Sequence, residues 1–400
     1  PPRSTLFPYT TLFRSLGHLV STLLLISAAT STDADIIAVG PDEAIRHISD
    51  AARLARDGDI VLIKAGTYRG DVAVWQQKKL EIRGVGGRPV LVADGMHAEG
   101  KAIWVFRDGE FEVDNIEFRG TRVPDGNGAG IRFERGRLTV RNCVFDDNQN
   151  GLLTANFEDT ELHIHDSVFS NAPRNGNQLA HLLYVGRIGQ VTIEGSRFHN
   201  GFEGQLIKSR AKRSDIRYNL IVDGPGGEAS YEIDLPNGGD ALLVGNVIGQ
   251  SASSQNPVMV AYGAEGPIWP GSRLRMAHNT LIHTGWRPAW FVRAWPDKLP
   301  PDTPIITRNN LHAGLGIFTT TLPGDHAGNV ALPASLLSPD ILDFTGPFGS
   351  ITRKFSVALE GTPEEDLRPT AAFAFPVGTS PRAPSTSPMP GAFEHNGLTH

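Results

Sequence analysis

Four charged side chains between Gln205 and Gly239 have the types and the spacing to do chemistry. Lys208 and Arg210 lie in the segment QLIKSRAKR, and Glu232 and Asp234 lie in YEIDLPN. One position separates the members of each pair, so a β-strand would project both from the same face. Two cations and two carboxylates on neighbouring strands have the means to bind an anionic substrate and to transfer a proton.

These residue types suffice for β-elimination at a uronic acid. The reaction needs a cation that neutralises the carboxylate, a base that removes the C5 proton and an acid that protonates the leaving oxygen. We expect Lys208 to be the base, with its pKa depressed by a neighbouring cation, and Arg210 to hold the carboxylate. Tyr184 or His181 would then protonate the leaving group.

The two carboxylates allow other functions. Glu232 and Asp234 are suited to bind Ca²⁺, whose charge would do the neutralising. Alternatively they are the acid pair of a glycoside hydrolase, because side chains at positions i and i+2 of a strand lie about 7 Å apart. With Lys208 close, Asp234 would stay ionised and Glu232 would donate the proton. A third interpretation is a non-catalytic binding or surface protein, in which Lys208 and Asp234 are an ordinary cross-strand ion pair.

A repeat in the sequence predicts the elements that carry these residues. Short segments of similar pattern recur at intervals of about 23 to 33 residues, as one coil of a three-stranded solenoid would. They end at Phe118, Phe145, Phe169, Phe198, Ile221, Ile248, Leu281 and Leu311. Two positions earlier stand Ile116, Cys143, Ser167, Ser196, Asn219, Asn246, Asn279 and Asn309. This column predicts a ladder of side-chain amides at a turn, repeated at about 4.8 Å. A β-sandwich would instead show hairpins with two-residue turns, which the sequence lacks.

A second set of strands lies between these segments and carries the charged residues. If Phe133, Thr154, Leu183, Ile207, Ile233, Val260 and Val292 point inward, the residues on either side of them point outward. One outward column is then Glu134, Ala155, Tyr184, Lys208, Asp234, Ala261 and Arg293, and Glu232 lies in the other. We therefore expect Tyr184, Lys208 and Asp234 to be neighbours on three consecutive coils. Asn237, Trp269, Trp286 and Arg293 are predicted to bind the substrate, because aromatic rings suit the apolar face of a sugar.

The composition limits the possible partners. Lys and Arg number 37 against 43 Asp and Glu, a net charge of −6, which argues against a protein that wraps nucleic acid. The lone Cys143 excludes an internal disulfide. Residues 42–57 carry apolar side chains at helical spacing, which predicts one short amphipathic helix.

The chain divides into four parts. Residues 1–15, PPRSTLFPYTTLFRS, resemble translated sequencing-adapter sequence and are excluded from the fold. Residues 16–35 contain an apolar run that fits a secretion signal and is too short to span a membrane. Residues 36–330 are predicted to form the solenoid, and 331–400 an irregular segment packed on it or trailing it. We expect a secreted or periplasmic monomer without a membrane anchor.

The repeat resembles that of secreted right-handed parallel β-helix proteins of the pectate-lyase-like superfamily. The resemblance implies an all-β fold, a single-stranded parallel β-helix whose open end the short N-terminal helix caps. The segment LIKSRAKRSDIRYN is also similar to a motif of the family that contains chondroitinase B and alginate lyases. Lys208 and Ser209 match its Lys-Ser pair and Asn219 its turn; Glu203 stands where an acidic calcium ligand belongs, and Gln205 where a second would be. The next coil, YEIDLPNGG, has no arginine at the expected place.

Overall fold

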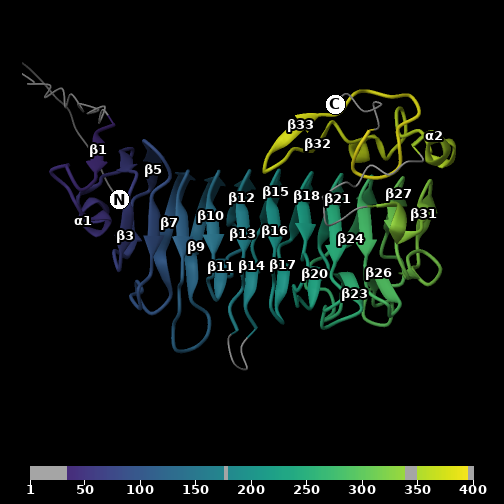
Figure 1. Cartoon of the computed structure of the whole chain (residues 1–400), viewed down its shortest axis with the longest axis horizontal. Helices are drawn as coiled ribbons and strands as arrows, with labels where there is room; N and C mark the ends of the chain where they lie inside the picture. Colours follow the sequence, from purple (N-terminus) through teal and green to yellow (C-terminus); the bar gives the residue numbers. More distant parts are fainter. Residues whose placement is uncertain (1–33, 175–178, 338–348, 395–400) are drawn as a thin grey trace, which may run out of the picture. The chain divides into compact units, whose positions relative to one another are not determined.

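The computed structural model describes residues 34–174, 179–337 and 349–394, which belong to one compact unit. Its chain winds into successive coils, each of which contributes up to three strands that pair in parallel with those of the next coil (Figure 1). The strands therefore form three rows, and the first and second rows join in one 20-stranded sheet. The predicted secretion signal and the adapter-like stretch before it fall outside the described residues, apart from residues 34 and 35.

Each row has one strand per coil, with two long strands that pass through both the first and the second row. The first row contains β4 (Ala73–Trp75), β7 (Ala102–Asp114), β9 (Ala129–Arg141), β11 (Asn150–Thr154), β14 (His181–Val185), β17 (Gln205–Ser209), β20 (Tyr231–Leu235), β23 (Val258–Tyr262), β26 (Ala289–Ala294) and β29 (Gly316–Ile317). The second row contains β1 (Ile36–Val39), β2 (Ile60–Lys64), β5 (Lys79–Val85), the second halves of β7 and β9, β12 (Glu161–His165), β15 (Gln190–Glu194), β18 (Arg213–Arg217), β21 (Asp240–Val244), β24 (Arg273–Ala277), β27 (Ile305–Arg308) and β30 (Asp325–Ala327).

The third row is a separate sheet of 11 strands. It contains β3 (Thr67–Arg69), β6 (Val90–Val92), β8 (Glu117–Arg119), β10 (Val144–Asp146), β13 (Val168–Ser170), β16 (Arg197–His199), β19 (Leu220–Val222), β22 (Val247–Gln250), β25 (Thr280–His283), β28 (Leu311–Ala313) and β31 (Val330–Leu332). These strands carry the repeat seen in the sequence, so the predicted solenoid is confirmed.

A polar ladder fixes the turn between the second and third rows. The side-chain oxygen of Asn246 accepts a hydrogen bond from the backbone N–H of Asn219 at 3.0 Å, and Asn246 in turn donates its backbone N–H to Asn279 at 3.0 Å. The residue before each ladder position has a positive φ, between 48° and 70° from Asn115 to Gly328. The predicted ladder is confirmed with one error. The residue after Asn279 in the ladder is Asn310, whose side-chain oxygen accepts the backbone N–H of Asn279 at 2.9 Å, and not the predicted Asn309.

Aromatic rings stack along the interior of the third row. Phe118, Phe145, Phe169 and Phe198 lie in register on successive coils, with ring centroids 5.1, 4.5 and 4.8 Å apart and nearly parallel planes. Each is at most 1 % exposed. Burying one such ring contributes roughly 1.5–3 kcal/mol, so the repeated phenylalanine is a major source of coil-to-coil stability. On β28, His312 and not the predicted Leu311 pairs with Leu281.

The structure has the predicted short helix, α1 (Ile48–Leu54). Its residues Ile48, Ala51 and Ala52 are buried, and the side-chain amide of Gln77 donates to the carbonyl oxygen of Ala52 at 3.1 Å. Apolar burial on one face therefore fixes this helix to the first coils. That it caps the open end of the stack stays a prediction.

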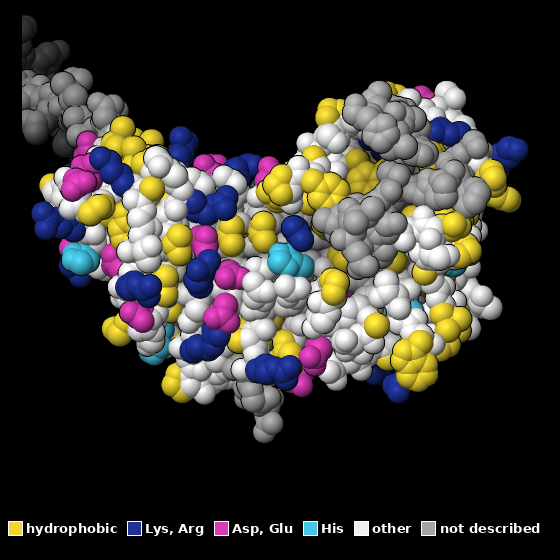
Figure 2. Space-filling model, viewed as in Figure 1, with side chains coloured by type: hydrophobic (Ala, Val, Ile, Leu, Met, Phe, Trp, Pro, Cys, Tyr) yellow, Lys and Arg dark blue, Asp and Glu magenta, His cyan; other side chains and the backbone are white. Residues whose placement is uncertain are grey.

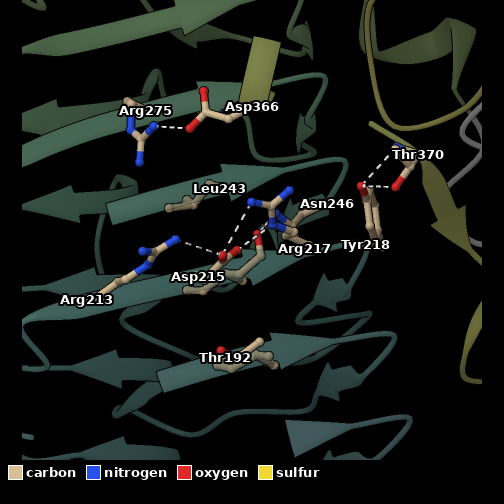
Figure 3. Close-up of polar contacts among 12 residues, drawn as sticks. Thr192, Arg213, Asp215, Arg217, Tyr218, Leu243, Asn246, Arg275, Asp366 and Thr370 are labelled. Carbon is tan, nitrogen blue, oxygen red and sulfur yellow. Dashed lines mark hydrogen bonds and ion pairs between the residues drawn. The ribbon is translucent and has the colours of Figure 1, made fainter. Parts of the chain in front are cut away.

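The C-terminal residues contain only short elements, namely η1 (Ala334–Leu336), α2 (Gly349–Thr352), η3 (Arg353–Phe355), η4 (Glu365–Leu367) and the antiparallel strands β32 (Ala371–Phe373) and β33 (Thr379–Pro381). Polar contacts join them to the outer side of the coils. The hydroxyl of Tyr218 accepts from the backbone N–H of Thr370 at 3.0 Å, and Arg275 forms an ion pair with Asp366 (Figure 3). Phe373 and Ala392 are buried in an apolar cluster with the third-row residue Val247. This segment is thus packed against the coils.

Acidic and basic side chains alternate on the surface. Figure 2 shows them interspersed over the N-terminal half of the face in view, without a large region of one sign. Cross-coil ion pairs in this half, such as Arg137 with Glu161 at 2.8 Å, keep charges of opposite sign next to each other. None of the helices in the described part of the chain has the length and apolar character of a membrane-crossing segment.

Candidate functional site

The outer side of the first row brings the predicted residues together. Tyr184 pairs with Lys208, Lys208 with Asp234, Asp234 with Ala261, and Ala261 with Arg293, in an unbroken outward column. The prediction that Tyr184, Lys208 and Asp234 are neighbours on consecutive coils is confirmed. The residues predicted to precede Tyr184 in this column, Glu134 and Ala155, are wrong.

Leu153, and not Ala155, precedes Tyr184 in this column, and Arg132 precedes Leu153. The inward residue that pairs with Leu183 is Leu152, which pairs in turn with Ile131. The prediction had placed Thr154 and Phe133 at these two positions, so its alignment of these two coils was shifted by two residues toward the C-terminus. Side chains two positions apart on a strand point to the same face, so this error left Thr154 and Phe133 on the predicted inward face. It does remove Glu134 and Ala155 from the row of Tyr184.

Lys208 lies at the centre of the cluster. Its side chain is 12 % exposed, its ammonium nitrogen lies 3.7 Å from Oδ2 of Asp234, and it lies 5.5 Å from the ring centroid of Tyr184. The amine is thus held between an aromatic face on one coil and a carboxylate on the next. A group placed in this way is suited to accept or donate a proton at the surface of the coils.

Asp234 is the more buried partner of this pair. Its side chain is 5 % exposed, and no described residue hydrogen-bonds to its Oδ1 atom. Burial raises the pKa of Asp234 from 3.8 to about 6, although the positive charge of Lys208 opposes this shift. Such a carboxyl group changes charge close to neutral pH, which is a property of acid–base sites.

Arg210 is held by the protein itself. Its terminal nitrogens donate to both carboxylate oxygens of Glu265, at 2.6 and 3.0 Å, and one of them also donates to Oδ1 of Asn237. Its Nε atom donates to the hydroxyl oxygen of Tyr184 at 3.1 Å. Glu265 thus fills the position that a substrate carboxylate would take, and the role of Arg210 in holding the substrate stays a prediction.

Glu232 does not share the surface of Asp234. It is 0 % exposed, and Oε2 accepts a hydrogen bond from the amide of Gln250 at 3.2 Å. Burial, followed by the charge of Asp223, raises its pKa well above the ordinary value, whereas Lys208 and Arg210 act on Asp234. The two carboxyl groups thus have different surroundings, and the predicted acid pair on one outward face is wrong. Leu206 and Met259, which the same prediction placed on the outer face beside Glu232, are core residues as well.

His181 is buried beside Tyr184, with ring centroids 5.2 Å apart. Its Nδ1 atom accepts the backbone N–H of Gln205 at 3.1 Å. Burial, aided by the charges of Lys208 and Arg210, lowers the pKa of His181 to about 3, so the imidazole is neutral near pH 7. A neutral ring with an occupied Nδ1 atom is a poor proton donor, which disfavours one of the two predicted acids.

The residues predicted to bind substrate lie in different environments. Asn237 and Trp269 are buried and hold the loop of Glu265: Asn237 donates to the carbonyl of Gly266 at 3.1 Å, and the indole N–H of Trp269 donates to the carbonyl of Arg210 at 2.9 Å. Trp286 is 76 % exposed and borders a hollow of about 340 Å³ between loops. Arg293 is exposed at the end of the outward column.

The predicted calcium ligands are not assembled. Glu203 lies in the loop before β17, where its backbone N–H donates to the carbonyl of Glu228, while Glu232 faces the interior. Within residues 34–174, 179–337 and 349–394, no group of three or more His, Cys, Asp or Glu side chains is arranged to hold a metal ion. The acidic residue types are present, but Glu232 is buried away from the other two, so the predicted set does not come together.

Sequence reasoning missed four residues of this surface. Glu265 follows Gly263, which has φ 80°, and reaches back to Arg210 from the loop after β23. Tyr231, Trp290 and Trp295 lie near the other end of the column, around Arg293. An aromatic residue on each side of Arg293 in AWFVRAW was the available signal for two of them. No pattern pointed to Glu265, because its partner is 55 positions away.

A groove of about 730 Å³ lies elsewhere, on the outer side of the third row. Arg197, His199, Leu220, Val222 and Gln250 are among the residues that line it. Its lining has no Asp, Glu or Lys, and burial, followed by the charge of Arg197, lowers the pKa of His199 to about 4. We place the candidate active site on the first row, because there a largely buried lysine faces a carboxyl group whose pKa is raised to about 6.

Comparison with known proteins identifies the architecture. The crystal structure of pectate lyase Pel9A superposes with a TM-score of 0.58, over 90 % of this chain and 96 % of that chain, at 15 % sequence identity. The chain has a pectate-lyase-like, right-handed parallel β-helix. No protein-family model matches the sequence, and no curated protein matches it. The predicted fold is confirmed, and at this level of identity the likeness is one of fold.

Proposed function

We propose that this β-helix protein is a polysaccharide lyase that cleaves a uronic-acid-containing polymer by β-elimination, outside the cytoplasm. The observation that carries the proposal is the position of Lys208, between the ring of Tyr184 and the carboxylate of Asp234 on three consecutive coils. The likeness to a pectate lyase supports a polysaccharide as the substrate. The hydrolase alternative loses support because Glu232 is buried away from Asp234.

The proposed step uses two side chains of the column. Lys208, in its unprotonated form, takes the C5 proton of the uronate; the electron pair of that C–H bond forms the C4–C5 double bond, and the C4–O bond breaks. Tyr184 gives its hydroxyl proton to the leaving oxygen, and solvent later restores both groups. Asp234, 3.7 Å from the amine, is placed to stabilise the ammonium ion that forms.

Tyr184 is a better candidate for the acid than His181. Arg210 donates its Nε hydrogen to the phenol oxygen at 3.1 Å, so the hydroxyl hydrogen of Tyr184 is left to point to another acceptor. Glu265 now occupies the outer edge of the same guanidinium. A substrate carboxylate would have to displace Glu265 to reach it.

The test is a screen of the purified protein against uronate polymers and neutral polysaccharides, with ultraviolet absorbance and reducing ends recorded together. A lyase yields both signals, a hydrolase yields reducing ends alone, and a binding protein yields neither. Lys208→Ala and Tyr184→Phe should each lower kcat by about 100-fold or more, the usual contribution of a general base or acid.

Lys101→Ala is the matched control for Lys208→Ala. Lys101 also forms a cross-coil ion pair, with its ammonium nitrogen 2.7 Å from Glu134, but it lies outside the column of Lys208. This variant should keep parental activity. Full activity of Lys208→Ala on a polymer that the parent cleaves would exclude Lys208 as the base.

A further inference from the structure

Arg293 differs from Arg210 in that it has no acidic partner among the described residues. Its guanidinium carbon lies 4.7 Å from the ring centroid of Trp295 and 5.4 Å from that of Trp290. Within the described residues it forms no ion pair and no side-chain hydrogen bond, whereas both terminal nitrogens of Arg210 bind Glu265. The Arg293 guanidinium thus lies over two indole rings, and its N–H donors have no acceptor among the described residues.

Arg293 is aligned with the candidate active site. Lys208, Asp234, Ala261 and Arg293 pair in register, so three steps of about 4.8 Å place Arg293 roughly 14 Å from Lys208 along the axis of the coils. Ala261 has a short, buried side chain and puts no charged group between them. A linear polymer that runs along the column would meet the two positions several sugar units apart.

The surroundings of Arg293 suit a sugar acid. Indole rings pack against the apolar face of a pyranose, and a guanidinium binds a carboxylate through two parallel hydrogen bonds. Tyr231 is half-buried on β20, whose coil lies between the coils of Lys208 and Arg293. Its hydroxyl is a further donor or acceptor for a sugar.

We propose that Arg293, Trp290 and Trp295 form a second binding subsite, which takes one uronate residue of a polysaccharide whose cleaved bond lies at Lys208. The alignment with Lys208 rests on the proposed function; the subsite itself does not. Arg293 binds the carboxylate and the indoles bind the ring, so the subsite selects long, charged substrates over short or neutral ones.

The subsite is tested by measuring the binding of galacturonate and mannuronate hexasaccharides by calorimetry. All variants carry Lys208→Ala, so that the oligosaccharide is bound but not cleaved. Arg293→Gln should weaken binding of the preferred hexasaccharide about 10- to 100-fold. Arg293→Lys should restore only part of it, because an ammonium group lacks the planar pair of donors. Arg69→Gln is the charge-matched control, since Arg69 is an exposed arginine on β3 of the other sheet and should bind as the parent does.

Initial rates on disaccharide and hexasaccharide substrates separate the subsite from the catalytic proposal. Arg293→Gln should raise KM for the hexasaccharide and leave kcat/KM for the shortest cleaved substrate unchanged. Unchanged binding of the hexasaccharide in Arg293→Gln, or no binding of either hexasaccharide by the Lys208→Ala protein, overturns the subsite. Weaker binding in Arg293→Gln together with an absence of elimination by the protein that retains Lys208 would keep the subsite and reject the lyase.

Discussion

Replacing Asp234 by asparagine is expected to stabilise the protein at neutral pH while it lowers turnover. Burial shifts the pKa of Asp234 from 3.8 to about 6 despite the nearby charge of Lys208. At 1.36 kcal/mol per pKa unit this shift corresponds to about 3 kcal/mol. An amide has the shape of the protonated carboxyl group and carries no charge, so Asp234→Asn should avoid this unfavourable energy.

The pH dependence follows from the direction of the shift. Below about pH 4 Asp234 is protonated in the folded and the unfolded chain alike, and it does not alter stability. Between pH 4 and about 6 the folded protein keeps a proton that the unfolded chain releases, so stability falls as the pH rises, and the full loss persists above pH 6. Asp234→Asn should therefore equal the parent near pH 4 and exceed it by up to about 3 kcal/mol at pH 7.

Urea unfolding at a series of pH values from 4 to 8 measures this difference, and Asp223→Asn is the matched control. Burial also raises the pKa of Asp223 to about 6, but its oxygens accept the backbone N–H groups of Gly201 at 2.7 Å and Ala229 at 2.9 Å. The amide nitrogen of an asparagine cannot accept a hydrogen bond, so Asp223→Asn loses one of these two bonds and should be about 1–3 kcal/mol less stable than the parent near pH 4, unlike Asp234→Asn. A pH profile of Asp234→Asn parallel to that of the parent would refute the assignment of this titration to Asp234.

Three further predictions concern other contacts. Glu265→Gln removes the charge that holds Arg210 and should lower KM for a uronate polymer several-fold in initial-rate kinetics; a higher KM would show that Glu265 only positions Arg210. Asn246→Ala leaves the buried backbone N–H of Asn219 without its acceptor and should reduce the free energy of unfolding by about 3 kcal/mol, measured in urea. Tyr218→Phe removes the hydroxyl that contacts Thr370 and should reduce stability by about 1 kcal/mol and speed limited proteolysis after the coils; unchanged proteolysis would argue against this anchor.

The third row could be predicted closely from the sequence because hydrogen bonding or packing restricts the residue type at one position of each coil. A buried side chain at the ladder must accept the N–H of the preceding coil, so serine and asparagine recur, and the ring stack requires Phe118, Phe145 and Phe169 at one fixed offset. The error at Asn309 has the same origin. Both Asn309 and Asn310 are amides, and counting back from an apolar Leu311 chose the wrong one of two neighbours.

The first row was less predictable because loops of variable length precede it. The strands of Lys208 and Asp234 were aligned correctly, since QLIKS and YEIDL each place an isoleucine, Ile207 and Ile233, directly before the charged residue. The strand of Leu152 and Thr154 offered two apolar-compatible registers, and alternation alone could not separate them. Ion pairs across long loops, such as that of Arg210 with Glu265, leave no periodic signal at all.

The burial of Glu232 shows why alternation fails at the corner where the third row enters the first. Because Ile207 and Ile233 point inward, strict alternation would place the residues before them, Leu206 and Glu232, on the outside. All four residues are nevertheless fully buried. At such a bend two consecutive side chains turn toward the core, and the carboxyl group of Glu232 meets Gln250 from the third row instead of solvent. The charged pair suggested by the spacing of Glu232 and Asp234 is thus divided between interior and surface. The proton chemistry of the outer surface must then come from Asp234, Lys208 and Tyr184, which lie past the bend, where alternation holds again.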